Sequence, residues 1–370
     1  MTEQRIAGVV PPGTHLRREI EARGWSQVDL AEILGRPIQV VNQILRGKKS
    51  ITATTARALE EATSIAAVTW LNFESQYQLS LEAKRSDDVA QRARLFSRAP
   101  VADLRRRAWV RNTRDITALK ADVLELLRID SLAEPPRVLF AARKSNGYGQ
   151  TSPEQEAWCC RALRLAEEMA GIPRFSRKKF ERGLSEVRDL CKSSQSVKFI
   201  PDALRNLGVV FLVVEHLPRT KIDGATFWLS RTRPVVVLSL RYGRIDYFAF
   251  TLMHELMHVR HGDAQSFDND ILNDGKEASL PEIEIRANKE AGELLVPPKE
   301  LAHFVASGRI NKSEIVAFAS NIGVHPGVVL GQLQHRRVVG WSACRDLLEP
   351  VRDIIVKNAT TDGWDKESSR

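Results

Sequence analysis

The stretch Thr251-Leu252-Met253-His254-Glu255-Leu256-Met257-His258 decides how this 370-residue chain is interpreted. On a helix, His254 and His258 lie four residues apart and project from the same face. Two imidazoles in that arrangement reach one tetrahedral metal ion, and Zn²⁺ is typically held by such ligands. The stretch therefore predicts a zinc-binding helix.

Glu255 directly follows the first histidine, and we expect a different role for it. In the pattern His-Glu-x-x-His the glutamate does not bind the metal. It acts as a general base that accepts a proton from metal-activated water and passes it toward the leaving amine. The pattern is typical of metallopeptidases, so Glu255 is the predicted catalytic residue.

A third protein ligand is expected from the later stretch 281–291. On a helix, Glu284 shares one face with small alanines that allow close approach to the metal helix, and with Asn288, which can hydrogen-bond a ligand histidine. Glu282 is an alternative ligand, but it falls about 200° around the helix from Glu284. His261 is another alternative, for which a solvated or dipole-capping role is expected.

Together these motifs resemble one known family. His254-Glu255-Leu256-Met257-His258, followed by Glu284-x-x-Ala287-Asn288-x-x-Ala291-x-x-Leu294-Leu295-Val296-Pro297, is similar to the ImmA/IrrE family of bacterial metallopeptidases. The apolar segments 224–228 and 234–238 also fit that family. The resemblance implies a zincin-like α+β fold, with His254, His258 and Glu284 as Zn²⁺ ligands and Glu255 as catalyst. Glu290, where the family usually has Phe, and Met257, where Gly is common, depart from the pattern.

The N-terminal part carries a different pattern. Ser26 is the expected N-cap and Asp29 stands at the capping-box position of a helix that ends near Gly35. A short turn and a second helix, about Ile38 to Leu45, follow. Two helices joined in this way predict a helix-turn-helix domain over residues 11–82.

The expected DNA contacts fall on and around the second helix. Its outward-facing residues are of types that pair with adenine edges in the major groove, namely Gln39, Asn42 and Gln43. Residues suited to phosphate contacts lie at the start of the first helix and after the second, namely Gln27, Arg46, Lys48 and Lys49. Residues 11–82, with Gly24-Trp25-Ser26-Gln27 and Trp70-Leu71-Asn72, resemble HigA-type antitoxins of the Cro/C1 class. The resemblance implies a dimer on a palindromic operator, although Ile38 stands where a polar base-reading residue is usual.

The positive charge is unevenly distributed. The chain has a net charge of +9, but basic and acidic residues nearly balance over residues 5–82. Residues 84–128 hold twelve basic and six acidic residues, a net of +6, with Arg105-Arg106-Arg107 at the centre. We expect this segment to strengthen DNA binding without adding sequence choice. In the alternative, these arginines pair with acids of the C-terminal domain or dock a protein partner.

The expected fold class is α+β overall and mostly α. Four parts are predicted: a helix-turn-helix domain (11–82), an Arg-rich helical linker (83–152) with Pro135, Pro136, Gly147 and Gly149, a zincin-like domain with a small sheet (153–340), and a C-terminal tail (341–370). The polar residues 358–370 at the end of this tail are expected to be frayed. No apolar run reaches the ~20 residues of a membrane span, and no signal peptide is evident. Four scattered cysteines favour a reduced compartment, so we expect a cytoplasmic protein.

The leading hypothesis is a regulator that binds an inverted repeat of double-stranded DNA as a homodimer. Its zinc endopeptidase domain would cleave a protein partner such as a repressor or toxin. The alternative is an antitoxin-like or stress transcription regulator whose zincin domain senses or docks a partner without proteolysis. No oxyanion stabiliser is assigned, and the candidates by chemistry are Tyr242, Tyr247, His325 and His335.

Overall fold

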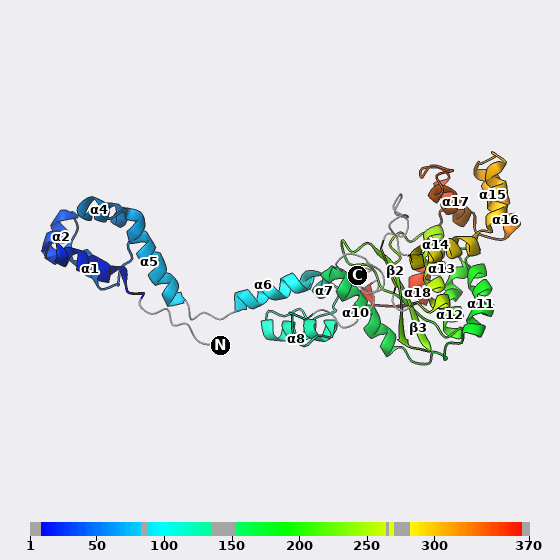
Figure 1. Cartoon of the computed structure of the whole chain (residues 1–370), viewed down its shortest axis with the longest axis horizontal. Helices are drawn as coiled ribbons and strands as arrows, with labels where there is room; N and C mark the ends of the chain where they lie inside the picture. The colour runs from blue at the N-terminus through cyan, green and yellow to red at the C-terminus, as the bar shows by residue number, and fades with distance from the viewer. Residues whose placement is uncertain (1–8, 83–87, 135–151, 264–265, 270–281, 365–370) are drawn as a thin grey trace. The chain divides into compact units, whose positions relative to one another are not determined.

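A computed structural model describes residues 9–82, 88–134, 152–263, 266–269 and 282–364. The chain divides into two compact units, Met1–Val89 and Ala90–Arg370 (Figure 1). This division differs from the expected one, because most of the described part of segment 83–152 belongs to the larger unit rather than to a linker. Residues 135–151, which hold the prolines and glycines of the expected linker, lie outside the described residues.

The smaller unit is all α-helical, as expected. Its helices are α1 (Pro12–Ala22), α2 (Gln27–Ile33), α3 (Ile38–Leu45), α4 (Ala53–Thr63) and α5 (Ala67–Glu82). The predicted capping box is present: the Asp29 N–H donates to Ser26 Oγ at 3.1 Å, and the Ser26 N–H donates to Asp29 Oδ2 at 2.7 Å. The core is formed by apolar side chains spaced at helical intervals, among them Leu16, Ile20, Leu30, Val41, Ile44, Leu59 and Trp70.

The larger unit is built on one mixed sheet. Its strands are β1 (Val210–Val213), β2 (Ile222–Ser230), β3 (Arg233–Leu238), β4 (Ser266–Asn269) and β5 (Thr360–Thr361), in the order β4-β2-β3-β1-β5. Strand β1 pairs in parallel with β3 and β5, whereas β2 pairs antiparallel with β3 and β4. The apolar segments 224–228 and 234–238 lie in β2 and β3, and the sheet among helices confirms the expected α+β class.

Helices cover both faces of this sheet (Figure 1). On one face, with Val210 and Leu212, helix α10 (Pro153–Glu168) packs against the strands, and α6 (Asp88–Arg98), α7 (Val101–Arg106) and α8 (Ile116–Leu127) extend the same apolar cluster. On the other face, with Phe211 and Val213, helices α12 (Ile200–Asn206) and α13 (Ile245–His261) pack against the strands. This second cluster continues into α11 (Arg177–Leu190), α14 (Glu282–Leu295), α15 (Pro298–Ala306), α16 (Lys312–Ile322), α17 (Pro326–His335) and α18 (Arg352–Asn358). Because successive side chains of a strand point to opposite faces, β1 is apolar throughout.

The described end of the chain is part of the fold rather than a frayed tail. Strand β5 lengthens the sheet beside β1, and Val351 and Ile355 lie in the core. Next to β5, the buried Asp362 carboxylate pairs with Arg107 Nη1 at 3.2 Å. A two-residue strand and a single acid give no periodic signal, so the sequence pattern did not reveal this role.

The three central arginines of the basic segment have partners inside the larger unit. Arg107 is buried, and besides Asp362 it donates to His216 O at 2.9 Å. Arg105 Nη2 donates to Thr113 O at 2.6 Å, and Arg106 pairs with the neighbouring Asp103. Of the three, Arg107 alone pairs with an acid from outside the basic segment, as the alternative expects, and this buried side chain is not accessible to a DNA phosphate.

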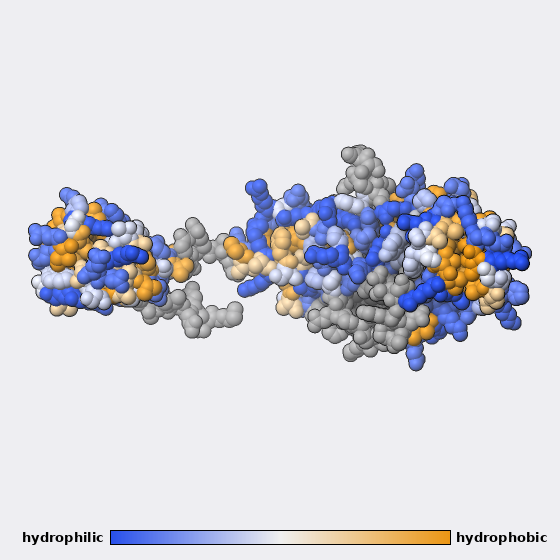
Figure 2. All heavy atoms as spheres, turned by 90° about the horizontal axis from the view of Figure 1, so that it is seen from above, coloured by the Kyte–Doolittle hydropathy of each residue, from blue (hydrophilic) through white to orange (hydrophobic). Residues whose placement is uncertain are grey.

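The surface in view is mostly hydrophilic, with separate apolar patches (Figure 2). Among the described helices, none is by itself long and apolar enough to cross a membrane, although the bent pair α16 and α17 passes that test together.

Candidate metal centre and DNA-binding face

Helices α13 and α14 bring three donor atoms together. His254 Nε2 lies 3.0 Å from His258 Nε2, and Glu284 Oε2 lies 3.2 and 3.4 Å from these two nitrogens. All three side chains are buried. The close approach of the helices depends on the small, buried Ala287 and Ala291, because larger side chains would hold α14 away from α13. The sequence grouped the same three residues.

The donor set fits a tetrahedral metal ion such as Zn²⁺. Ligand atoms bound to such an ion at about 2.0–2.2 Å are about 3.3 Å apart, which is close to the three observed separations. The Nδ1 atoms donate elsewhere: His254 to Asn288 Oδ1 and His258 to Asp263 Oδ2, each at 2.9 Å. A neutral ring with the proton on Nδ1 carries a lone pair on Nε2. The two lone pairs and the Glu284 carboxylate then repel one another unless a positive charge lies between them.

Asp263 extends the centre toward solvent, and sequence reasoning missed it. Gly262 ends α13 with φ +72°, and Asp263 then turns back to His258. Arg286 Nη2 donates to both Asp263 oxygens, at 2.9 and 2.8 Å. Partial burial alone would raise the pKa of Asp263, but the hydrogen bonds from His258 and Arg286, with their charges, lower it overall. A helix-ending glycine followed by an acid was the available signal.

Strand β2 fixes the carboxylate of Glu255. The side chain is fully buried, and Thr226 Oγ1 donates to Glu255 Oε2 at 2.7 Å. The backbone of Gly224 passes so close that a Cβ there would lie 2.2 Å from Glu255 Oε1. The sequence drew attention to this strand only through the family resemblance and assigned no role to either residue. Their effect is to hold Glu255 in one position beside the metal donors.

The two alternative ligands lie elsewhere. Glu282 is exposed at the start of α14. His261 Nε2 pairs with Glu290 Oε2 at 2.9 Å, and Arg260 Nη1 lies 3.5 Å from the same oxygen. Polar partners at the helix surface therefore accommodate Glu290, which stands where the family usually has Phe. Met257, the other departure, is buried in the core.

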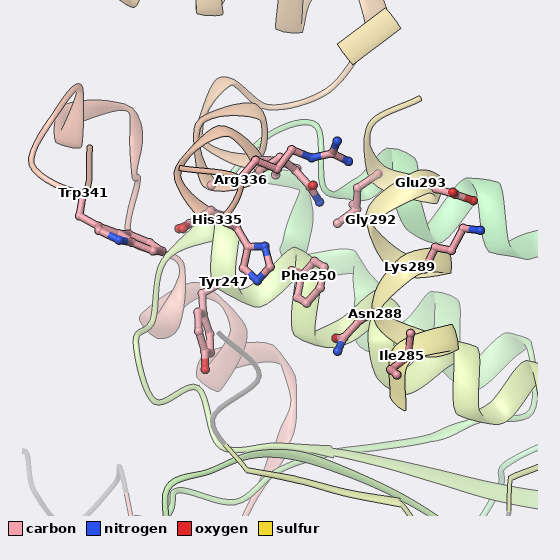
Figure 3. A pocket seen from close by; sticks show the side chains of 15 residues that line it. Tyr247, Phe250, Ile285, Asn288, Lys289, Gly292, Glu293, His335, Arg336 and Trp341 are labelled. Carbon is pink, nitrogen blue, oxygen red and sulfur yellow. The ribbon is translucent and has the colours of Figure 1, made fainter. Parts of the chain in front are cut away.

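The four oxyanion candidates separate by environment. His325 Nδ1 accepts from the Gly327 N–H at 3.0 Å and so caps α17. Tyr242 is half exposed, and its ring lies 4.4 Å from that of Tyr247. Tyr247 is buried, and burial is the largest cause of a pKa raised far above its ordinary value. Together with His335, Tyr247 lines a cavity that also includes Asn288 (Figure 3).

The expected DNA contacts lie at the surface of the smaller unit. On α3, the apolar Val41, Ile44 and Leu45 are buried, whereas Gln39 and Gln43 are exposed and Asn42 is partly exposed. Arg46, Lys48 and Lys49 are exposed after α3, and Gln27 is partly exposed at the start of α2. Ile38, at the first position of α3, is also exposed. Their contacts with DNA stay predictions.

Comparisons with known proteins fit this division. A family model described as "Helix-turn-helix" matches residues 16–68, and one described as "IrrE N-terminal-like domain" matches residues 210–336. A solved structure of an addiction module antidote protein of a HigA family, from Coxiella burnetii, is 33% identical over 20% of this chain and 83% of that chain, with a TM-score of 0.20. No curated protein matches the chain. The matches confirm the expected pairing of domains: the chain joins a helix-turn-helix domain to a domain of the IrrE type.

Proposed function

We propose that this protein is a DNA-binding regulator whose IrrE-type domain is a zinc-dependent endopeptidase acting on a protein partner, such as a repressor or toxin. The observation that carries the proposal is the placement of Glu255. Its carboxylate is buried, held by Thr226 and adjacent in sequence to a metal-donor histidine. A purely structural zinc site needs four protein ligands and no general base. Three donors beside a fixed carboxylate suit hydrolysis better.

In this proposal His254, His258 and Glu284 would hold a Zn²⁺ ion, which would supply a water molecule acidic near neutral pH and a positive charge for the substrate carbonyl. Glu255 accepts the proton of that water as the water oxygen bonds to the carbonyl carbon. The carbon–nitrogen bond then breaks, and Glu255 delivers the proton to the leaving nitrogen. Asn288 keeps the His254 ring oriented through Nδ1.

The DNA-binding domain is proposed to act as a homodimer on a short inverted repeat. Exposed glutamines on α3 support base contacts, and the basic residues that follow support phosphate contacts. Helix α5 leaves large apolar side chains exposed on one face, Val68 by 61% and Leu79 by 70%, and this face is proposed to contact the second copy. DNA as a partner and four free thiols make the cytoplasm the proposed location.

Proteolysis is tested by comparing wild type with Glu255→Gln. Each purified, zinc-loaded protein is incubated with a cell lysate, and new protein N-termini are identified by mass spectrometry. We expect new N-termini with wild type alone, whereas both proteins bind about one Zn²⁺ per chain. If zinc binds but wild type generates no new N-termini, the proposal fails. The alternative, a partner docked without cleavage, then predicts that both proteins capture the same partner.

Base recognition is tested with Gln43→Ala after an operator has been selected from random duplexes. The variant should lose about 1–3 kcal/mol on the operator and little on scrambled DNA, since an adenine contact carries sequence choice. Equal losses on both duplexes would mean that Gln43 does not read a base.

A further inference from the structure

A cavity of about 340 Å³ adjoins the metal centre. It lies between the N-terminal half of α13, the outward side of α14 and the C-terminal half of α17 (Figure 3). Tyr247 and Phe250 come from α13, His335 from α17 and Trp341 from the loop that follows, and these rings face a common space. The volume is at the small end of the range for ligand pockets, and it holds one large side chain or two small ones.

Asn288 links this cavity to the donor atoms. The residue lines the cavity, and its Oδ1 accepts the Nδ1–H of His254 at 2.9 Å. Phe250, one helical turn before His254, lines the same cavity, and its ring centroid is 6.4 Å from that of His254. The cavity is therefore separated from a metal-donor histidine by the single side chains of Asn288 and Phe250.

The wall favours an apolar occupant. Apart from Tyr247 and Phe250, the apolar contribution comes from Ile285, Val328 and the half-exposed Trp341. Aromatic walls of this kind stabilise a large aromatic or long aliphatic side chain by burial and by edge or face contacts.

Charge on the wall does not select a charged occupant. Lys289, Glu293 and Arg336 are exposed and so stay in contact with solvent, and the buried Asp246 is paired with Arg244 at 2.8 Å. A buried charge in the occupant would lack a dedicated partner, which is costly.

We propose that this cavity binds a large apolar side chain, aromatic or long aliphatic, of the protein substrate next to the cleaved peptide bond. The inference rests on the proposed peptidase function and adds the substrate class. The site thus distinguishes substrates by the size of one side chain, since each buried methylene group that fits contributes about 0.8 kcal/mol.

Gly292 gives the means to test this. It lines the cavity from α14, and the nearest atom to a Cβ built there is Gln332 Nε2 at 3.2 Å, the end of a flexible side chain. Gly292→Leu should fill the space without displacing backbone. Gly292→Ala is the matched control, because it makes the same glycine replacement and leaves most of the cavity open. Both changes raise helix propensity, so the fold is expected to persist.

The measurement is a profile of cleavage sites in a peptide library derived from a proteome, with zinc content determined for each protein. Wild type and Gly292→Ala should cut beside Phe, Leu or Met, and Gly292→Leu should lose these cuts at least tenfold relative to cuts beside Ala or Gly, with zinc retained. Cleavage by wild type with no preference at these positions, or an identical profile for Gly292→Leu, overturns the inference and leaves the peptidase function standing. Absence of any cleavage by zinc-loaded wild type overturns both.

A second readout is independent of catalysis. Trp341 lines the cavity, so binding of a Phe-containing peptide to zinc-loaded Glu255→Gln should change tryptophan fluorescence, and its Ala analogue should bind at least tenfold more weakly. Adding Trp341→Phe should remove most of the signal. Equal affinity for the two peptides contradicts the proposal.

Discussion

Replacing Asp263 by Ala should weaken metal binding although Asp263 is not a ligand. Asp263 accepts from His258 Nδ1 at 2.9 Å and is held by Arg286 at 2.8 Å. The carboxylate therefore keeps the proton on Nδ1, orients the ring and makes Nε2 a stronger donor. Removing such a partner of a ligand histidine typically costs 10–100-fold in metal affinity, or about 1.4–2.7 kcal/mol.

That loss should appear as a loss of zinc-dependent stability. With free zinc about 1,000-fold above the dissociation constant, binding stabilises the folded state by about 4.1 kcal/mol, which falls to about 1.4–2.7 kcal/mol in Asp263→Ala. For a domain of this size each kcal/mol is worth about 2–4 °C, so the zinc-induced rise in Tm should shrink by about 3–11 °C. Asp263→Asn keeps an acceptor oxygen and should lie between the two.

The assay is thermal unfolding with and without zinc, together with zinc competition against a chelator of known affinity. Asp346→Ala is the matched control, because Asp346 is also an acid paired with a cation but is exposed on another part of the unit. The reasoning is refuted if Asp263→Ala binds zinc as tightly as wild type while its metal-free Tm is unchanged.

Three further outcomes follow from the structure. Gly224→Ala should push the Glu255 carboxylate by about 1 Å and lower kcat/KM about 100-fold on any peptide that wild type cleaves, with zinc content unchanged. Unaltered kinetics would mean that strand β2 does not hold the Glu255 carboxylate in place. Arg107→Ala should lower the free energy of unfolding, measured by urea denaturation, by about 3–5 kcal/mol, because it leaves the buried Asp362 carboxylate without its cation. The salt dependence of DNA binding should stay unchanged, and a flatter salt slope would show that the basic segment contacts DNA. In the folded protein at pH 8, a thiol reagent should modify one cysteine quickly, and Cys344→Ser should abolish that reaction. The other three thiols are buried, and burial raises their pKa, to about 12 for Cys160 and Cys191. Rapid modification of a second thiol would show that a core helix opens easily.

The site was largely predictable because its chemistry follows helical spacing. His254 and His258 are one turn apart on α13, so periodicity pairs them, whereas Glu284 was preferred through the alanine stripe that it shares and was completed as a ligand by the family resemblance. What fixes the site from outside the two helices was not predictable. Thr226 reaches Glu255 from a strand 29 residues away in sequence, and such a contact exists only once the sheet has formed.

The division into units was predicted less well, for a related reason. Arginine-rich helices with a sparse apolar stripe look like a solvated linker, but Leu95, Leu104 and Leu119 are fully buried in the apolar cluster that includes α10 and one face of the sheet. Strand β1 is buried on both of its faces, so helices are required on each side of the sheet. The sequence did not show which helices cover each side, since burial of a helix depends on its partner.

The pairing of Arg107 with Asp362 bears on how this IrrE-type module can be moved between proteins. Residues matched to the IrrE type end at 336, yet the sheet takes one strand from residues 360–361 and one face of its cover from residues before 170. A transplant cut at the bounds of sequence similarity would leave apolar strand surface and an unpaired sheet edge in water, and it should aggregate. A transplant that is expected to fold therefore has to carry residues 90–364. This range is wider than residues 210–336, over which sequence similarity to the IrrE type is detected.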